Sequence, residues 1–580
     1  MELYCNNVAE INSQGRRLTI SADDLKLLSP NTGRCPTISA AIDFQLLKQA
    51  IQRFGILVNE IENTNPWQIT YGSMYHMSGD SGEFVTLEKL IELGAKKAIF
   101  NAYQLNSTEK YLPLYEGKYI QQYDYRFSSF EGVDKKTRFG KKPATHSPTE
   151  SQKQDPQYAI EPRYWLDGAE FLNRFGHRYE RSYYLAARLI TNVISNGRTV
   201  MACVMPRLPA NNLVVTIQMN SNRSGRGEAI LMSVLNSFVA DYFARLKMSE
   251  NLLKGVFYEI PVPNPEIISK AKWPGTQNSF EAETIKRVLE LTYTAWDLEA
   301  FAQDCGWSGP PFRWDEERRF LLRCELDAAF FHLYLGPETE WRQQPADLTQ
   351  AFPTPRAAVA YILDTFPIVK RKDEAKFNGD YRTKRVILEI YDALAAAMQS
   401  GQAYQTRLNP APASLAVAHP WDWQAKPLEL PAVLRVPLPE SWQYVVNVMV
   451  ELLWQAGGSL PWRVFRTATD LLSDRNRLAR LAELHVGQVA LDWLALNGDS
   501  FDATHRWDQL SGFCQQGKMR VVRRNDELIV ELMSADGHVL FPHVRFDAQL
   551  ALTVVRSQPV AAPTPAEAKE ERRVAELIPA

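Results

Sequence analysis

The sequence predicts a multi-domain protein of the α/β (α+β) class, in which an α/β region is followed by a helical bundle region and a small C-terminal helical module. β-Branched runs bounded by turn formers alternate with helical patterns over residues 1–275, and long amphipathic patterns fill residues 276–405. Length supports the same class, because 580 residues with 45% hydrophobic side chains suffice for several buried cores.

Composition limits the classes of function. The net charge is only -2, with 65 basic and 67 acidic side chains, so a nucleic-acid partner would have to be met by a local basic patch. The six cysteines show no CxxC or Cys/His spacing, which argues against structural zinc and favours a reducing, cytoplasmic setting. We find neither a leader pattern nor a long uncharged apolar run, so the sequence indicates no membrane partner.

Residues 1–130 read as the N-terminal part of an α+β domain, with turn formers (SPNTG) at residues 29–33. Residues 131–157 contain almost no large apolar side chains and are predicted to form a flexible basic arm. Within this arm, KKTRFGKK at residues 135–142 gathers five cations and no acid. It is either a solvated loop or a segment that contacts phosphates.

Residues 158–275 are predicted to complete the α/β domain. TVMACVMP at residues 199–206 and NNLVVTIQM at residues 211–219 read as strands. Apolar side chains then recur at helical spacing, which predicts one helix from about Glu228 to Lys247. The GxG before this helix lacks the third glycine and the downstream acid of a dinucleotide fingerprint, so it does not indicate a nucleotide site.

The second half of the chain is expected to be mainly helical. Residues 276–405 carry three amphipathic helical stretches, and the proline-rich residues 406–440 are predicted to be a linker. Residues 441–558 combine short helices with a hairpin turning at Asn525-Asp526, which fits a winged-helix-like module or a packed protein-interaction domain. The tail 559–580 is expected to be disordered.

No catalytic signature is complete in the sequence. There is no NPPY-type tetrapeptide, FxGxG turn, GxxxxGK[ST], HExxH or GxSxG, so we predict no catalytic residue, cofactor ligand or metal ligand in this chain. Asp364, Glu374 and Lys376 match the loose Asp…Glu-x-Lys spacing of metal-dependent nucleases. Because their surroundings read as a solvated loop before a helix, this match supports only an alternative.

Several stretches together resemble the region downstream of the catalytic domain in large adenine-N6 DNA methyltransferases. The relatives are the type IIG restriction-modification enzymes and the methylases of BREX- and DISARM-type phage-defence systems. The stretches include SPNTGRCP, NPWQITYGSMYHMSGDSGEF, YEGKYIQQYDYRF, SNGRTVMACVMP, EIPVPNP and PPFRWDEERRF. They occur in order between Ser21 and Leu394.

The resemblance implies a target-recognition domain without its catalytic domain. It therefore implies a non-catalytic specificity subunit that binds double-stranded DNA and directs a catalytic methyltransferase subunit, which would bind S-adenosylmethionine, to its site. Asn65-Pro66-Trp67 resembles a catalytic tetrapeptide lacking one proline, but it opens a segment that resembles the recognition region. We therefore expect Asn65 in a turn and Trp67 as a buried aromatic.

The resemblance and the local charge pattern together nominate twelve side chains for DNA contact. Arg198 could face DNA or pin a loop, and Arg245 could simply pair with Asp241 four residues earlier. The tyrosines of YEGKYIQQYDYRF could offer surfaces to DNA or form a half-buried aromatic strand. The predicted DNA-binding residues are Lys118, Tyr123, Arg126, Lys135, Lys136, Arg138, Lys141, Lys142, Arg198, Asn236, Arg245 and Lys247.

Two other functions remain open from the sequence. The chain could be a divergent DNA-acting enzyme, either a nuclease or a methyltransferase. It could instead be an assembly scaffold that recruits other proteins of a defence complex, with its DNA contact incidental.

Overall fold

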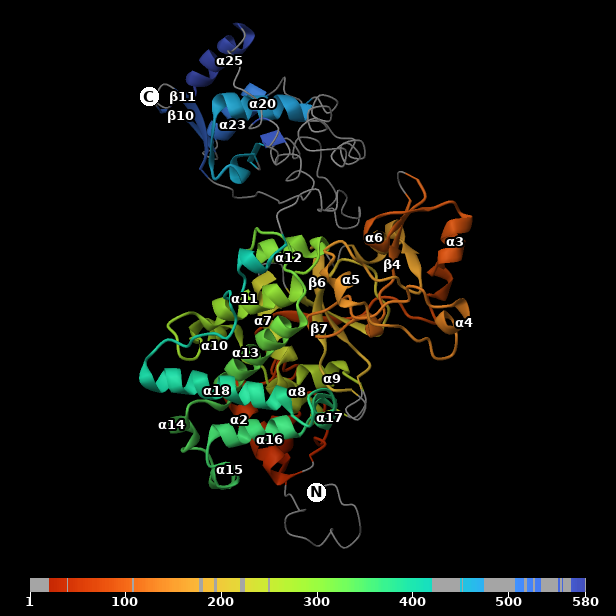
Figure 1. Cartoon of the computed structure of the whole chain (residues 1–580), viewed down its shortest axis with the longest axis vertical. Helices are drawn as coiled ribbons and strands as arrows, with labels where there is room; N and C mark the ends of the chain where they lie inside the picture. Colours follow the sequence, from red (N-terminus) through yellow and green to blue (C-terminus); the bar gives the residue numbers. More distant parts are fainter. Residues whose placement is uncertain are drawn as a thin grey trace. The chain divides into compact units, whose positions relative to one another are not determined.

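The computed structural model describes most of residues 20–419 and several stretches of residues 449–578 (Figure 1). The gaps before residue 420 are 39, 107–108, 177–180, 192–195, 220–224 and 249–250; the later stretches are 449–450, 452–473, 506–515, 519–524, 527–533, 551–552, 555 and 565–578. The chain divides into an N-terminal unit, Met1–Trp421, and a C-terminal unit, Asp422–Ala580. Both mix helices with strands, which confirms the predicted mixed α/β class at this level.

The main sheet of the N-terminal unit has four antiparallel strands in the order β1-β8-β6-β7. Leu185 of β6 lies between Val204 of β7 and Ile217 of β8, and all three side chains are buried. The strands predicted at 199–206 and 211–219 are confirmed, although each begins about three residues later. The bounds are β1 (Ile69–Gly72), β6 (Tyr183–Arg188), β7 (Ala202–Pro206) and β8 (Val214–Met219).

A second antiparallel sheet lies closer to the N-terminus in sequence, with its strands in order along the chain. Trp165, fully buried, packs with Leu90 and Tyr103 in a small core beneath it. Helices α3 (Leu87–Glu92) and α6 (Gly168–Phe175) lie beside this sheet in Figure 1. The strands are β2 (Lys96–Lys97), β3 (Tyr103–Gln104), β4 (Lys110–Pro113) and β5 (Trp165–Asp167).

The helix predicted from Glu228 to Lys247 is wrong as one element, because the chain forms α7 (Gly225–Asn236) and α8 (Phe238–Arg245). Ser237 interrupts it and caps α8 by accepting a hydrogen bond from the Ala240 amide. The Asn236 carboxamide is turned to β7, where it bonds both the amide (2.9 Å) and the carbonyl (2.8 Å) of Ala202. These bonds compensate the break, which apolar periodicity alone does not reveal.

The expected helices of residues 276–405 are present (Figure 1). Helix α11 packs against α7, α13 packs against α11, and α18 packs against α13. Residues 369–382 read from the sequence as a solvated loop, but residues 369–376 belong to a helix that begins at Pro367 and leaves most of its charges exposed. The main helices are α11 (Phe280–Thr292), α12 (Glu299–Asp304), α13 (Glu316–Leu335), α16 (Pro355–Asp364), α17 (Pro367–Lys376) and α18 (Arg382–Ser400).

Six further helices belong to the described part of the N-terminal unit. They are α1 (Ala22–Leu28), α2 (Ala41–Phe54), α9 (Lys254–Tyr258), α10 (Pro265–Lys270), α14 (Glu338–Trp341) and α15 (Ala346–Ala351). None of the helices that the structure describes combines the length and apolarity that a membrane crossing requires.

Segment 131–157 departs from the predicted flexible arm, because it forms α4 (Lys135–Arg138) and α5 (Glu150–Gln154) against its neighbours. Ser129 and His146 pair as a β-bridge across it. Polar contacts replace the missing apolar core: Arg138 donates to the Phe130 carbonyl (2.7 Å) and pairs with Glu161. Composition excluded a hydrophobic core here, but it did not exclude order built from hydrogen bonds.

The beginning of the predicted 406–440 linker also packs on the helices. Ala418 pairs with Phe312 in a β-bridge, and the Ala413 amide donates to the Glu290 carboxylate at 3.0 Å. A 3-10 helix, η7 (Leu415–Val417), lies between them. The remainder of the predicted linker lies outside the described residues.

The C-terminal unit contains a three-stranded antiparallel sheet in the order β10-β11-β9. The hairpin strands are confirmed, while the turn at 525–526 lies outside the described residues. Part of the tail expected to be disordered forms α25, whose Glu570 accepts from Arg466 of α20 at 2.9 Å. The elements are β9 (Ser459–Pro461), α20 (Trp462–Ser473), α23 (Arg506–Gln515), β10 (Met519–Arg524), β11 (Glu527–Leu532) and α25 (Pro565–Ala575).

The expectation for the NPW tripeptide is confirmed. The Asn65 carboxamide closes a turn by bonding the Ile69 carbonyl (2.8 Å) and amide (3.0 Å). Trp67 is 2% exposed, and its indole N–H donates to the Pro263 carbonyl at 3.1 Å. The tripeptide therefore supports the fold and presents no stacking face to a base.

The buried ion pair of Glu259 and Lys247 joins the EIPVPNP segment to the SPNTG turn. Glu259, in EIPVPNP, accepts the amides of Asn31 (3.0 Å) and Thr32 (2.9 Å) in the SPNTG turn. Lys247 lies 3.5 Å from the same carboxylate and donates to the Leu28 carbonyl. Burial lowers the pKa of Lys247 to about 8, which shows how fully this clamp is removed from water.

The first prediction concerns His332 of α13, which is stacked on Tyr391 and bonded to its carbonyl at 3.0 Å. Burial lowers the pKa of His332 from 6.5 to about 4, so the unfolded chain binds a proton between these pH values and the folded chain does not. The folded protein therefore becomes less stable as pH falls through this window. At pH 5 the contribution of His332 to the free energy of unfolding is lower by about 2 kcal/mol. Urea denaturation measures the decrease in the free energy of unfolding that His332→Gln causes. This decrease should be smaller at pH 5 than at pH 7 by that amount.

The matched control for this prediction is Tyr334→Phe, which removes another buried side-chain bond to a carbonyl, at 2.8 Å from Pro261, without removing an imidazole. Its effect on the free energy of unfolding should differ less between the two pH values. An equal pH effect in both variants would contradict the assignment.

Candidate functional site

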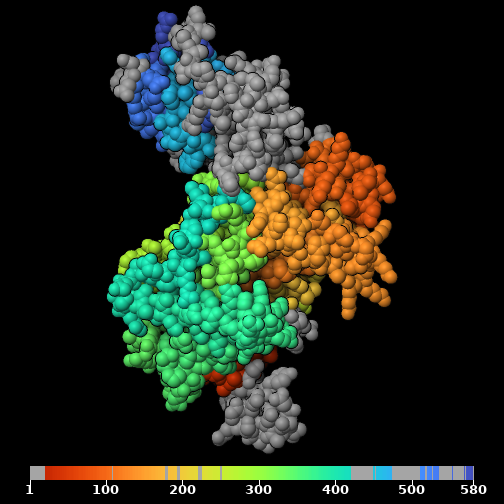
Figure 2. All heavy atoms as spheres, in the orientation of Figure 1, coloured from red at the N-terminus to blue at the C-terminus, as the bar shows by residue number. Residues whose placement is uncertain are grey.

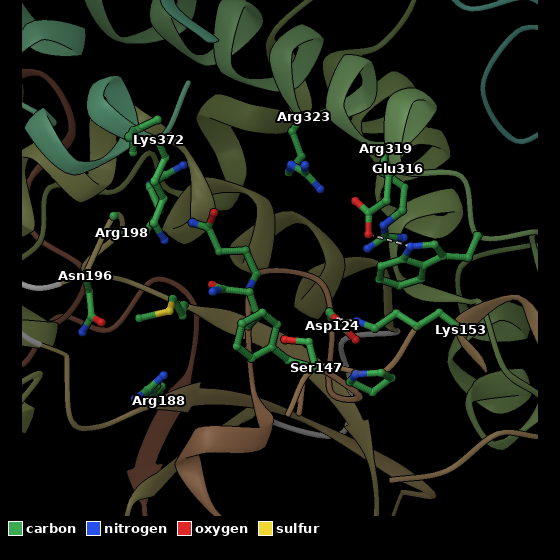
Figure 3. Close-up of a pocket in the computed structure, with 18 of the residues that line it drawn as sticks. Asp124, Ser147, Lys153, Arg188, Asn196, Arg198, Glu316, Arg319, Arg323 and Lys372 are labelled. Carbon is green, nitrogen blue, oxygen red and sulfur yellow. Dashed lines mark hydrogen bonds and ion pairs between the residues drawn. The ribbon is translucent and has the colours of Figure 1, made fainter. Parts of the chain in front are cut away.

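A basic cavity of about 570 Å³ lies within the N-terminal unit, between strand and loop residues on one side and helices on the other (Figure 3). Figure 2 shows the orange and green surfaces of these two regions adjoining. Three carboxylates line the cavity: Asp124, Glu316 and Asp373. Six cations line it: Lys153, Arg188, Arg198, Arg319, Arg323 and Lys372.

The three carboxylates are already engaged by protein groups. Asp124 pairs with Lys153, and Glu316 accepts the Trp314 indole N–H at 2.8 Å. Asp373 accepts the Thr383 amide at 2.6 Å, near the start of α18. The cations outnumber the carboxylates by three, so the cavity carries a positive potential suited to an anionic ligand.

Arg188, the last residue of β6, supplies the strand side of the cavity. Its backbone amide donates to the Met201 carbonyl at 3.0 Å, which continues the pairing with the β7 segment. Among the described residues its guanidinium has no hydrogen bond or ion pair, and partial burial lowers its pKa. A desolvated cation without a partner is unfavourable until an anion arrives.

Arg319 of α13 lines the opposite side and is 3% exposed. It lies over the Trp314 ring at 3.5 Å and donates from Nη1 to the Leu291 carbonyl at 2.6 Å. Its Nε has no hydrogen-bond partner within the described structure. Burial, reinforced by the neighbouring Arg323, lowers the pKa of Arg319 to about 9, so the guanidinium is charged at neutral pH but poorly compensated.

Arg323 follows Arg319 by one helical turn, which places both side chains on the same face of α13. Arg323 is partly buried, whereas Lys372 of α17 is exposed. In the part of the chain that the structure describes, neither side chain forms an ion pair or a hydrogen bond. These two cations are therefore available to a ligand without breaking a protein contact.

Arg198 is held by the protein as well as lining the cavity. Its guanidinium donates to Asp241 (2.7 Å) and to the Asn236 carbonyl (2.6 Å) and lies 3.8 Å from the centre of the Phe238 ring. Arg245 donates to the Gly197 carbonyl at 3.1 Å. Both arginines pin the loop before β7, which was one of the two sequence interpretations of Arg198.

The predicted DNA-binding residues are not gathered at the cavity; of the twelve, all among the described residues, Arg198 alone lines it. Tyr123, Arg126, Arg138, Asn236 and Lys247 are buried or nearly so. Arg126, fully buried, donates to the Lys153 and Asp155 carbonyls, among others. The aromatic residues Tyr115, Tyr119, Tyr123 and Tyr125 are all buried, so they offer no surface to DNA. The segment is not the half-buried strand of the alternative interpretation, because it contains a 3-10 helix, Gly117–Tyr119, and no named strand.

The remaining predicted residues lie at or near the surface. Lys118 is 3.6 Å from Glu116 and 5.0 Å from the centre of the Phe130 ring. Lys135 lies 3.6 Å from Glu88. Lys136, Lys141 and Lys142 are exposed, and α4 lies at the outer edge of the N-terminal unit in Figure 1.

Sequence reasoning missed five of the six cavity cations. Arg319 and Arg323 left one usable signal, since their spacing of four places them together on a helix face. The sequence holds no comparable signal for Arg188, Lys153 and Lys372. Nothing in their local sequence shows that β6, α5 and α17 meet.

The nuclease-like residues do not form a common site. Asp364 of α16 pairs with Lys384 at 2.6 Å, and Glu374 of α17 lies 3.9 Å from Lys370. Within the described residues, no group of three or more His, Cys, Asp or Glu side chains is arranged to hold a metal ion.

A scan against family models, a search of curated proteins and a search of solved structures each find no match to this chain.

The second prediction compares two buried arginines: Arg319, whose charge is poorly compensated, and Arg126, whose terminal nitrogens are bonded to carbonyls. Arg319→Met removes a poorly compensated cation, so the loss of its bond to Leu291 should be offset and the free energy of unfolding should change by less than about 1 kcal/mol. Arg126→Met leaves several buried carbonyls without a donor and should lower the free energy of unfolding by about 3 kcal/mol or more. Urea denaturation of the full chain measures both, and a cost for Arg319→Met equal to that for Arg126→Met would contradict this distinction.

Proposed function

We propose that the chain is a non-catalytic DNA-binding specificity subunit that directs a partner adenine-N6 DNA methyltransferase to its site. The observation that most supports this function is the basic cavity, in which six cations and three engaged carboxylates meet in a chain of net charge -2. Phosphates are the anions that such local clusters of arginine and lysine bind best. The resemblance of the segments between Ser21 and Leu394 to recognition regions supports the same function.

The charged residues divide into two roles under this proposal. The exposed Lys136, Lys141 and Lys142 would contact phosphates without reading the sequence. The buried Arg126 and Asn236 would hold the recognition domain in shape, since their polar atoms are bound to backbone groups. S-adenosylmethionine would belong to the partner.

The third prediction concerns the lysines around α4. Replacing Lys135, Lys136, Lys141 and Lys142 with Ala should weaken binding to every duplex tested, because phosphate contacts are independent of sequence. The slope of log affinity against log salt concentration should fall by up to about one per lysine that contacts a phosphate. Fluorescence anisotropy across a salt series measures both quantities.

The matched control removes four lysines from elsewhere in the same unit: Lys26, Lys254, Lys270 and Lys272, all exposed. It changes the net charge equally and should leave the slope near that of the parent chain. If both variants lose the same affinity, the lysines around α4 act only through overall charge.

The fourth prediction separates a specificity subunit from an enzyme. The purified chain, incubated with duplex DNA, S-adenosylmethionine and Mg²⁺, should neither transfer a methyl group nor cut the DNA. Methyl transfer, or cutting that is lost in Asp364→Asn with Glu374→Gln, would replace the proposal with the enzyme alternative.

A further inference from the structure

We infer that the basic cavity binds a single phosphodiester strand, not an intact duplex. The inference deepens the function proposed above and takes from it nucleic acid as the class of ligand. One phosphate would lie at Arg319 and Arg323 of α13, and another at Arg188 of β6. The strand would be a locally unpaired segment of the DNA that the chain binds.

The size of the cavity favours a single strand. A volume of about 570 Å³ lies in the range of pockets that enclose one small ligand, so it can take one or two nucleotides of a strand. The major groove of B-form DNA is by itself about 12 Å wide, so a duplex is too broad to enter. A single strand, which can turn its bases individually, fits between the two sides.

The charges lie on opposed sides of the cavity. Figure 3 shows Arg319, Arg323 and Lys372 on the helical side and Arg188 on the strand side. A cavity of this volume cannot hold a whole duplex between its walls, whereas a strand between them can be contacted from both sides. Cations on both sides therefore match a strand that passes between them.

Arg319 makes the helical side a built anion site. Its side chain is 97% buried, and its Nε is one donor for which the described structure provides no acceptor. Stacking on Trp314 fixes the guanidinium plane, so the donor is already oriented. An arriving phosphate oxygen would satisfy that donor and compensate a cation that burial has already desolvated.

The rest of the lining suits nucleobases. Phe127 is partly exposed and provides an aromatic surface, while Trp314 is already covered by Arg319 and Lys153. Gln121 and Asn196 add partly exposed carboxamides that can bond base edges. Such a mixture of cations, one aromatic surface and adaptable amides binds single strands with little dependence on sequence.

Binding of the full chain to matched DNA ligands tests the inference. The ligands are a perfect duplex, the same duplex with an unpaired central bubble, and the bubble sequence as a short DNA strand or RNA strand. We expect the bubble duplex to bind about tenfold more tightly than the perfect duplex, as one or two added phosphate contacts allow. The variant Arg188→Gln with Arg323→Gln should remove this advantage.

The controls keep the result interpretable. Neither Arg188 nor Arg323 has an ion-pair partner among the described residues, so the double variant leaves no carboxylate unpaired and should melt near the parent temperature. Lys270→Gln with Lys272→Gln makes the same charge change at exposed positions and should retain the preference for the bubble. If the Arg188→Gln with Arg323→Gln variant keeps the preference for the bubble duplex, the inference is overturned.

The remaining outcomes separate this inference from the proposed function. Equal binding of perfect and bubble duplexes overturns the inference and leaves the specificity function intact. Binding of the DNA strand without any duplex binding, or tighter binding of the RNA strand, supports a single-strand site in the cavity but overturns both its assignment to unpaired DNA and the specificity function. Displacement of the strand by an equal concentration of adenosine monophosphate assigns the cavity to a free nucleotide and overturns the inference.

Discussion

The buried carboxylate of Asp241 on α8 holds together the elements that form the cavity. It accepts the Thr199 amide at 3.0 Å and the Arg198 guanidinium at 2.7 Å, and so attaches the loop before β7 to the helix. Asp327 of α13 accepts the first amide of α8, at Phe238, and burial raises the pKa of Asp327 to about 6. Two carboxylates thus fix the strand side and the helical side relative to each other.

The N-terminal unit uses buried arginines in two different ways. Arg126 has both terminal nitrogens bonded to carbonyls, so its charge serves to join four separate backbone positions. Arg319 is equally removed from water but has far fewer bonds, and its neighbour Arg323 carries the same charge. Both arginines leave Nε without a hydrogen-bond partner in the described structure. The terminal nitrogens of Arg126 are bonded within the protein, whereas Arg319 has one such bond and would gain more from a bound anion.

Regular elements could be predicted from the sequence, but the candidate site could not. The buried strands around Val204 and Val215 and the helices after residue 276 follow from apolar periodicity, and Asn65 and Trp67 from their surroundings. The break at Ser237 and the order around Arg138 depend on hydrogen bonds to distant residues, which periodicity cannot show. Most predicted DNA contacts were chosen by charge, and charge does not distinguish an arginine bonded inside the fold from one that faces a cavity.

The positive cavity also affects how the protein behaves in solution. Arg323 and Lys372 have no ion-pair partner in the described structure, so small anions from the medium will accumulate between the walls. Phosphate or sulfate in a buffer would then compete directly with any larger ligand, and release of these ions would make its binding partly entropic. Affinity would depend on which anion is present as well as on ionic strength, and it would be higher in chloride than in phosphate or sulfate at equal ionic strength.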